Sequence, residues 1–172
     1  SQTNVPALRA VPAVLCLAAL CMAGTAYAEL ASPLSTPPTN TVAQGEVVFA
    51  DLVTTDVQSA ARFYTAVFGW AVRESDDPAY LELVHEGELI GAIARFEDAV
   101  DAGSARWLPS VSVRDVDAAA GSVEAMGGTV LEPPADFPDR GRLAVIADSE
   151  GAVLMLLRSS SGDPERTSGG FA

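Results

Sequence analysis

The stretch DVQSAA at residues 56–61 recurs 59 residues later as DVDAAA at residues 115–120. Each copy follows an apolar run with strand character, 47–53 and 108–113, and leads through an alanine-rich helical pattern to a glycine. A repeat of this length is typical of one supersecondary unit used twice. We therefore expect two similar halves built around a shared concavity.

Each copy predicts the element order βαβββ. The first predicts a strand at about 46–54, a helix between Asp56 and Gly69, and strands at 70–74, 80–85 and 89–96. The second predicts a strand at 108–113, a helix at 116–126, and strands at 129–131, 142–147 and 153–157. One amphipathic helix for four strands favours an α+β fold, with two βαβββ modules forming a curved mixed sheet around a concave pocket and the helices on its outer face.

The chain ends differ in composition from the predicted domain at 46–158. Residues 1–28 combine one basic residue, an apolar run at 10–24 and the motif AYA at 26–28, which is typical of a signal peptide. Residues 29–45 read as a proline-rich linker, and 159–172 read as a disordered tail, because neither offers enough apolar surface to order itself.

The N-terminal segment also decides the predicted location. Both cysteines, Cys16 and Cys21, lie within it, so cleavage after Ala28 would leave a chain without thiol or disulfide chemistry. We predict a periplasmic or secreted protein. The alternative is an uncleaved segment, 11–28, that anchors the chain, and it would be the chain's one contact with a membrane.

The charge excludes several classes of function. The chain has 10 basic against 23 acidic residues, a formal charge of −13, and all the basic residues are arginines. The absence of lysine excludes Schiff-base chemistry and a Walker-type phosphate loop. Strong acidity argues against nucleic acid as a partner. It is compatible with a cationic ligand, or simply with solubility.

Five short stretches resemble the vicinal oxygen chelate superfamily, which includes glyoxalase, bleomycin-resistance and extradiol dioxygenase proteins. They are LVTTD at 52–56, FYTAVFGW at 63–70, VRDVDA at 113–118, GG at 127–128 and GR at 141–142. The resemblance spans about 46–158. It implies a two-module scaffold shared by proteins of differing chemistry, and a possible pairing of modules in a homodimer.

The resemblance also implies a place for a metal ion. Metal-using members carry His, Glu or Gln at one inward position on each of four strands, and these positions align with Phe49, Gly91, Leu108 and Met155. None of the four supplies a nitrogen or oxygen side chain, and a thioether alone is a weak, soft ligand. We therefore predict no metal, no other cofactor and no catalytic residues.

Polar residues on the same strands are the candidate orienting groups. Asp51 and Val53 share a strand face with Phe49, and Ser110 and Ser112 share one with Leu108. A carboxylate turned inward needs a partner, such as an arginine, water, or a cationic or hydroxyl-bearing ligand. The alternative is that Asp51 lies at the sheet edge or pairs internally with Arg95 or Arg142.

For the other candidate residues, the sequence favours structural roles over functional ones. His85 is the only histidine and falls in a predicted turn beside Glu86, so a solvated side chain is favoured over a ligand or base. We expect Trp70 and Trp107 to close the ends of the core rather than to form a stacking wall for a ligand. Arg140 and Arg142 could clamp an anion, but a solvated loop with one salt bridge is favoured.

Together these observations predict an exported small-molecule-binding protein of the glyoxalase/bleomycin-resistance type without a metal site. A net-negative protein favours a cationic guest. The predicted ligand-binding residues are Phe49, Asp51, Val53, Leu108, Ser110, Ser112 and Met155. One alternative is a metal-dependent lyase, isomerase or dioxygenase with displaced ligands. Another is a structural or interaction subunit whose pocket is filled.

Overall fold

The computed structural model describes residues 32–75, 78–95 and 105–165. Residues 1–31, which include the predicted signal peptide, 76–77, 96–104 and 166–172 lie outside the described residues. Within the described ranges, no helix is long and apolar enough to cross a membrane.

Eight strands form one sheet in the order β2-β3-β4-β1-β5-β8-β7-β6. The first half contains β1 Val47–Thr54, α3 Val57–Phe68, β2 Ala71–Glu74, β3 Tyr80–His85 and β4 Glu88–Arg95. The second half contains β5 Arg106–Ser112, α4 Val116–Val123, the 3-10 turn η2 Glu124–Met126, β6 Thr129–Phe137, β7 Gly141–Ala147 and β8 Val153–Ser159.

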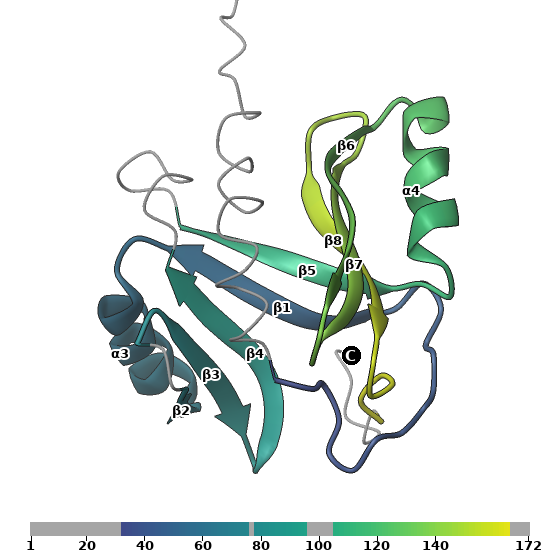
Figure 1. Cartoon of the computed structure of the whole chain (residues 1–172). Helices are drawn as coiled ribbons and strands as arrows, with labels where there is room; N and C mark the ends of the chain where they lie inside the picture. Colours follow the sequence, from purple (N-terminus) through teal and green to yellow (C-terminus); the bar gives the residue numbers. More distant parts are fainter. Residues whose placement is uncertain (1–31, 76–77, 96–104, 166–172) are drawn as a thin grey trace, which may run out of the picture.

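The two halves of the sheet pair their strands in the same way. In the first half β1 is parallel to β4, and in the second half β5 is parallel to β8. The antiparallel pair β1 and β5 joins the halves into one mixed sheet. Figure 1 shows that the sheet is strongly curved and that α3 and α4 lie on its outer side. The predicted α+β fold is confirmed.

Local sequence signals place the two helices. Asp56 Oδ1 accepts a hydrogen bond from Ser59 N at 2.9 Å, and Asp115 Oδ1 accepts one from Ala118 N at 2.9 Å. Each aspartate therefore satisfies a free N–H group of the first turn. Gly69 ends α3 with φ +71°, in the left-handed conformation that glycine adopts without strain.

The predicted element limits are wrong at two places in the second half. The helix expected at 116–126 ends at Val123 and continues as the 3-10 turn η2. The strand expected at 129–131 extends to Phe137. Its pairing with β7 shifts register twice, around Glu132. These irregularities accommodate Pro133 and Pro134, which lack the N–H group that a regular ladder needs.

Three clusters of buried side chains surround the sheet. One packs α3 against the first half, around Leu52, Val57 and Leu83. A second packs α4 against the second half, around Val116 and Ala144. The third lies on the inner, concave face and draws on both halves. Its members are Leu34, Phe49, Val53, Tyr80, Ala92, Ala94, Leu108, Phe137, Leu143, Val145, Met155 and Leu157.

The described parts of the predicted linker and tail form hydrogen bonds with each other. Residues 34–43 and 161–163 bind each other, and we name them together the clasp. Asp163 is its centre, since Oδ2 accepts from Ala43 N at 2.6 Å and from Ser112 Oγ at 2.5 Å. Thr39 Oγ1 donates to the Asp163 carbonyl at 2.7 Å. Neither segment has much apolar surface of its own, so mutual hydrogen bonds and the burial of Leu34 in the inner cluster supply the order.

Candidate functional site

The inner face carries two buried carboxylates in one row across three strands. Asp51 on β1 stands opposite Ala92 on β4, and Ala92 stands opposite Glu82 on β3. Asp51 and Glu82 each expose only 3 % of their surface. Residues in register across neighbouring strands share a face, so both carboxylates border the small side chain of Ala92.

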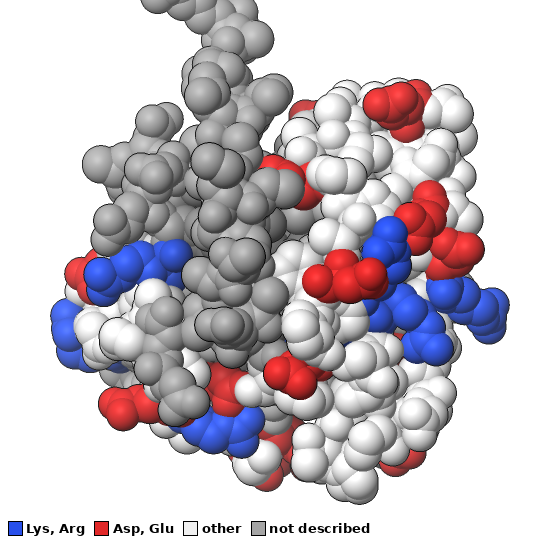
Figure 2. All heavy atoms as spheres, in the orientation of Figure 1, with Lys and Arg blue, Asp and Glu red and all other residues white. Residues whose placement is uncertain are grey.

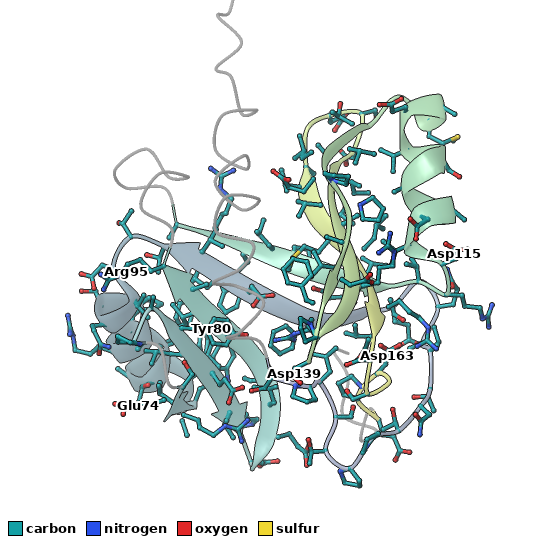
Figure 3. All side chains as sticks on the ribbon, viewed as in Figure 1. Glu74, Tyr80, Arg95, Asp115, Asp139 and Asp163 are labelled. Atoms are coloured by element: carbon teal, nitrogen blue, oxygen red, sulfur yellow. The ribbon has the colours of Figure 1, made fainter. Side chains whose placement is uncertain are left out.

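Arg140 brings a cation to the same place from the other half of the sheet. It follows β6 in the turn before β7 and is 4 % exposed. Its Nη2 donates to the Tyr80 hydroxyl at 3.0 Å, and its Cζ lies 4.2 Å from the centroid of the Phe49 ring. Figure 3 shows this turn, marked by Asp139, reaching toward β1 on the side of the sheet where Tyr80 lies.

The pKa of Tyr80 reports the charges around its hydroxyl. Burial raises this pKa well above its ordinary value, and the negative charge of Asp51 raises it further. Arg140 acts in the opposite direction, and Glu82 adds to the increase. The hydroxyl therefore stays protonated at neutral pH, within the fields of two carboxylates and one guanidinium.

Glu82 links this interior to the rim of the sheet. Its Oε2 accepts a hydrogen bond from Nε of Arg73 on β2, whose side chain is mostly exposed. Its Oε1 is buried and has no hydrogen-bond partner among the described residues. A buried carboxylate oxygen of this kind is costly to the folded state.

The side chains at the aligned metal positions do not fit a divalent cation. Phe49, Leu108 and Met155 do lie together in the inner cluster, as predicted. None offers a nitrogen or oxygen ligand, and the guanidinium of Arg140 lies over the Phe49 ring. Within the described ranges, no group of three or more His, Cys, Asp or Glu side chains is placed to hold a metal ion.

The alignment of Gly91 with an inward metal-ligand position is wrong. A side chain at Gly91 would point to the helix side, where its Cβ would lie 3.6 Å from the Trp107 ring and 3.9 Å from Leu83. It would also lie 2.9 Å from the carbonyl oxygen of Ala50, so glycine is required by close packing. The register of β3 and β4 shifts beside Leu83, and Ala92 takes the inward position instead.

The other predicted site residues divide into two groups. Val53 and Ser110 are buried, and Ser110 lies in one row between Phe49 and Met155. Ser112 instead donates to Asp163, so its hydroxyl serves the clasp. Ligand binding by the group on the inner face stays a prediction.

The predicted arginine pair does not act as a clamp. Arg140 is buried, whereas Arg142 forms exposed ion pairs with Asp117 at 2.6 Å and Asp136 at 3.0 Å. Acidic and basic groups intermingle on the right-hand part of the face in Figure 2, as is usual for a solvated surface. Arg142 therefore belongs to the surface.

Sequence reasoning missed Tyr80 and Glu82, and the solvated loop that it favoured for Arg140 is wrong, because Arg140 is buried. The pattern YLEL at 80–83 alternates, with Leu81 and Leu83 in the helix-side cluster, so a period of two could have placed Tyr80 and Glu82 on the inner face. No local signal marks Arg140, because its burial depends on where a turn of the second half meets the first half.

Trp70, Trp107 and His85 occupy the structural positions that the sequence analysis favoured. Trp70 and Trp107 pack with Tyr64 on the helix side, and Trp107 Nε1 donates to the Tyr64 hydroxyl at 2.9 Å. The Tyr64 and Trp70 rings stack at 5.7 Å. His85 ends β3 with an exposed side chain before the turn at Glu86 and Gly87. None of these residues lies on the inner face.

Comparison with known proteins gives a family and a set of relatives. A family described as Glyoxalase-like domain matches residues 46–157. A Mycobacterium tuberculosis protein named "Putative glyoxylase CFP32" is 34 % identical over 122 residues, which cover 68 % of this chain and 47 % of that protein. The anthracycline biosynthesis protein DnrV of Streptomyces peucetius is 32 % identical over 133 residues, or 67 % of this chain and 48 % of that protein. The chain thus spans about half the length of these relatives.

Solved structures support the fold. The Mn(II)-bound glyoxalase from Novosphingobium aromaticivorans superposes with a TM-score of 0.50 and 18 % identity, covering 72 % of this chain and 43 % of that chain. A variant of homoprotocatechuate 2,3-dioxygenase from B. fuscum superposes with a TM-score of 0.51 and 18 % identity, covering 79 % of this chain and 37 % of that chain. At this identity the likeness concerns the scaffold.

Proposed function

This chain belongs to the glyoxalase-like family, and from that premise we propose that it binds a small organic molecule on the inner face of its sheet without a metal ion. One observation carries the proposal. Phe49, Leu108 and Met155, at positions that the resemblance aligns with the family's site, lie together on the inner face beside the buried carboxylates of Asp51 and Glu82. Apolar walls with a few polar groups are typical of small-molecule sites.

The charges favour a ligand with a cationic or hydroxyl-bearing end. The charges of Asp51, Glu82 and Arg140 all act on the Tyr80 hydroxyl, and the whole chain is strongly acidic. A charge-assisted hydrogen bond from a ligand to Asp51 would contribute about 1.5–3 kcal/mol. The name of DnrV, which refers to anthracycline biosynthesis, adds support for an aromatic ligand.

Calorimetry on the full chain tests the proposal with a panel of aromatic amines and their uncharged analogues. We expect the amines to bind more tightly than the analogues, and Asp51→Asn to weaken their binding about tenfold or more. Asp136→Asn, an exposed carboxylate paired with Arg142, is the matched control and should leave binding unchanged. Equal affinities for Asp51→Asn and the unmodified chain would remove Asp51 from the site, and a panel without any binder would contradict the proposal.

We further propose that the protein is exported and forms a homodimer. Export is supported by the N-terminal pattern alone, and cell fractionation tests it. The dimer is supported by three exposed apolar side chains on one face of α3, Phe63, Val67 and Phe68. Phe63→Asp should shift the sedimentation coefficient from that of a dimer to that of a monomer; an unchanged value would contradict this interface.

A further inference from the structure

An open groove lies at the end of the sheet where β6, β7 and β8 meet. Its volume is about 510 Å³, which is within the range of small-molecule sites. The end of β6 contributes Phe137, the turn after it contributes Pro138, and β7 and β8 contribute Arg142 and Arg158. Asp139 marks this turn in Figure 3. The groove therefore combines two guanidinium groups with an apolar wall.

Three charged residues form one row across the strands of the groove. Asp136 on β6 stands opposite Arg142 on β7, and Arg142 stands opposite Arg158 on β8. The two arginines alternate with residues of the inner cluster, so they lie on the helix side of the sheet, as Ala144 and Leu156 do. Like charges directly opposite each other destabilise a sheet. This row therefore favours additional negative charge beside the arginines.

Arg142 receives its negative charge from within the chain. Its Nε and Nη2 donate to the carboxylate of Asp117 on α4 at 2.6 and 2.8 Å, and its Nη1 lies 3.0 Å from Asp136 Oδ1. Both aspartates are thus committed to Arg142, and they leave the second arginine of the pair to be neutralised in another way.

Arg158 has no such partner. Its side chain is half-buried, and its Nη1 donates to the carbonyl of its neighbour Ser159 at 3.3 Å. Within residues 32–75, 78–95 and 105–165, no carboxylate pairs with Arg158, and its Nε and Nη2 have no acceptor. A guanidinium has five N–H donors in a planar fork, so most of its donors stay available to a ligand in the groove.

We infer that this groove binds a small organic anion, and that Arg158 receives its carboxylate while its apolar part covers Phe137 and Pro138. The guanidinium fork matches the two coplanar oxygens of a carboxylate. The whole chain is acidic, but at physiological ionic strength exposed charges more than about 8 Å apart are largely screened, so the neighbouring arginines decide. The site is separate from the inner face and adds a second binding function to the one proposed above.

Benzoate, a carboxylate on an aromatic ring, is the probe, and benzamide is its uncharged analogue. Ligand-observed NMR with the full chain should show saturable binding of benzoate and much weaker binding of benzamide. We expect Arg158→Gln to weaken benzoate binding about tenfold or more, because the charged fork is lost. Arg114→Gln changes an exposed arginine outside the groove, so this matched control should bind benzoate as the unmodified chain does.

Three results would overturn the inference. They are an unmodified chain that does not bind benzoate, benzamide binding as tight as that of benzoate, and a folded Arg158→Gln protein, checked by circular dichroism, with the affinity of Arg114→Gln. None of them affects the proposed function of the inner face, which aromatic amines test. If Arg158→Gln does not fold, Arg158→Lys decides the question, because lysine keeps the charge but loses the fork. Weaker benzoate binding by Arg158→Lys supports the inference, and equal binding overturns it.

Discussion

The inner and outer faces of the same sheet differ in the kind of side chain that they bury. On the outer face, α3 and α4 cover apolar clusters whose main polar members, Tyr64 and Trp107, bond to each other. On the inner face, apolar side chains surround Asp51, Glu82 and Arg140. Buried charges give little net stability compared with apolar packing. The difference supports the proposal that the inner face, rather than the outer face, is where a ligand binds.

Removing the buried cation should give the largest loss of stability. Arg140→Met leaves two carboxylates buried in the inner cluster, and we expect the free energy of unfolding to fall by about 3–5 kcal/mol. Arg142→Met is the matched control, and because its ion pairs are exposed it should change stability little. Urea unfolding measures both. Equal losses for the two variants would contradict the contrast between buried and exposed arginines.

Two substitutions that each create a cavity, one on each face, would show whether the two faces differ in function. Leu83 lies in the α3 cluster and Leu108 in the inner cluster, and both are fully buried. Leu83→Ala and Leu108→Ala should each lower the free energy of unfolding by about 2–5 kcal/mol. Calorimetry with aromatic amines should then detect a change for Leu108→Ala alone. A Leu83→Ala protein with equally altered affinity would show that the faces are not functionally distinct.

The clasp extends the comparison, because it closes part of the inner face with Leu34. Asp163→Ala removes the acceptor of Ala43 N and Ser112 Oγ, so it should cost about 1–3 kcal/mol. Asp139→Ala, an exposed aspartate in the β6–β7 turn, is a suitable control. Hydrogen exchange of the amides in 34–43 should accelerate in Asp163→Ala. Unchanged exchange there would mean that Asp163 does not hold the clasp.

The smallest effect concerns the response of the inner face to alkaline pH. The pKa of Tyr80 is raised in the folded protein, so the unfolded chain loses this proton first, near pH 10. The stability contributed by neutral Tyr80 is therefore complete below about pH 10 and declines as the pH rises above it. Urea unfolding between pH 8 and 11 should show a steeper decline for the unmodified chain than for Tyr80→Phe. Parallel profiles would show that Tyr80 is not kept neutral by its surroundings.

Much of the fold followed from the sequence, and much of the site did not. The pattern around 56–61 and 115–120 predicted both helices with their caps, because these signals are local. Strand alternation placed Phe49 and Asp51 inward. Gly91 was misplaced because a shift in register cannot be read from one strand. Arg140 and the clasp depend on contacts between residues more than 50 positions apart, which carry no local pattern.

The most direct test of the claim that the inner face binds its ligand without a metal ion is a titration of the purified chain with Mn²⁺, followed by electron paramagnetic resonance of the free ion. Because Arg140 already holds a positive charge over Phe49, and the aligned side chains lack metal-binding atoms, we predict no saturable binding. Saturation at one ion per chain, abolished by Asp51→Asn, would contradict the account and return the inner face to metal chemistry.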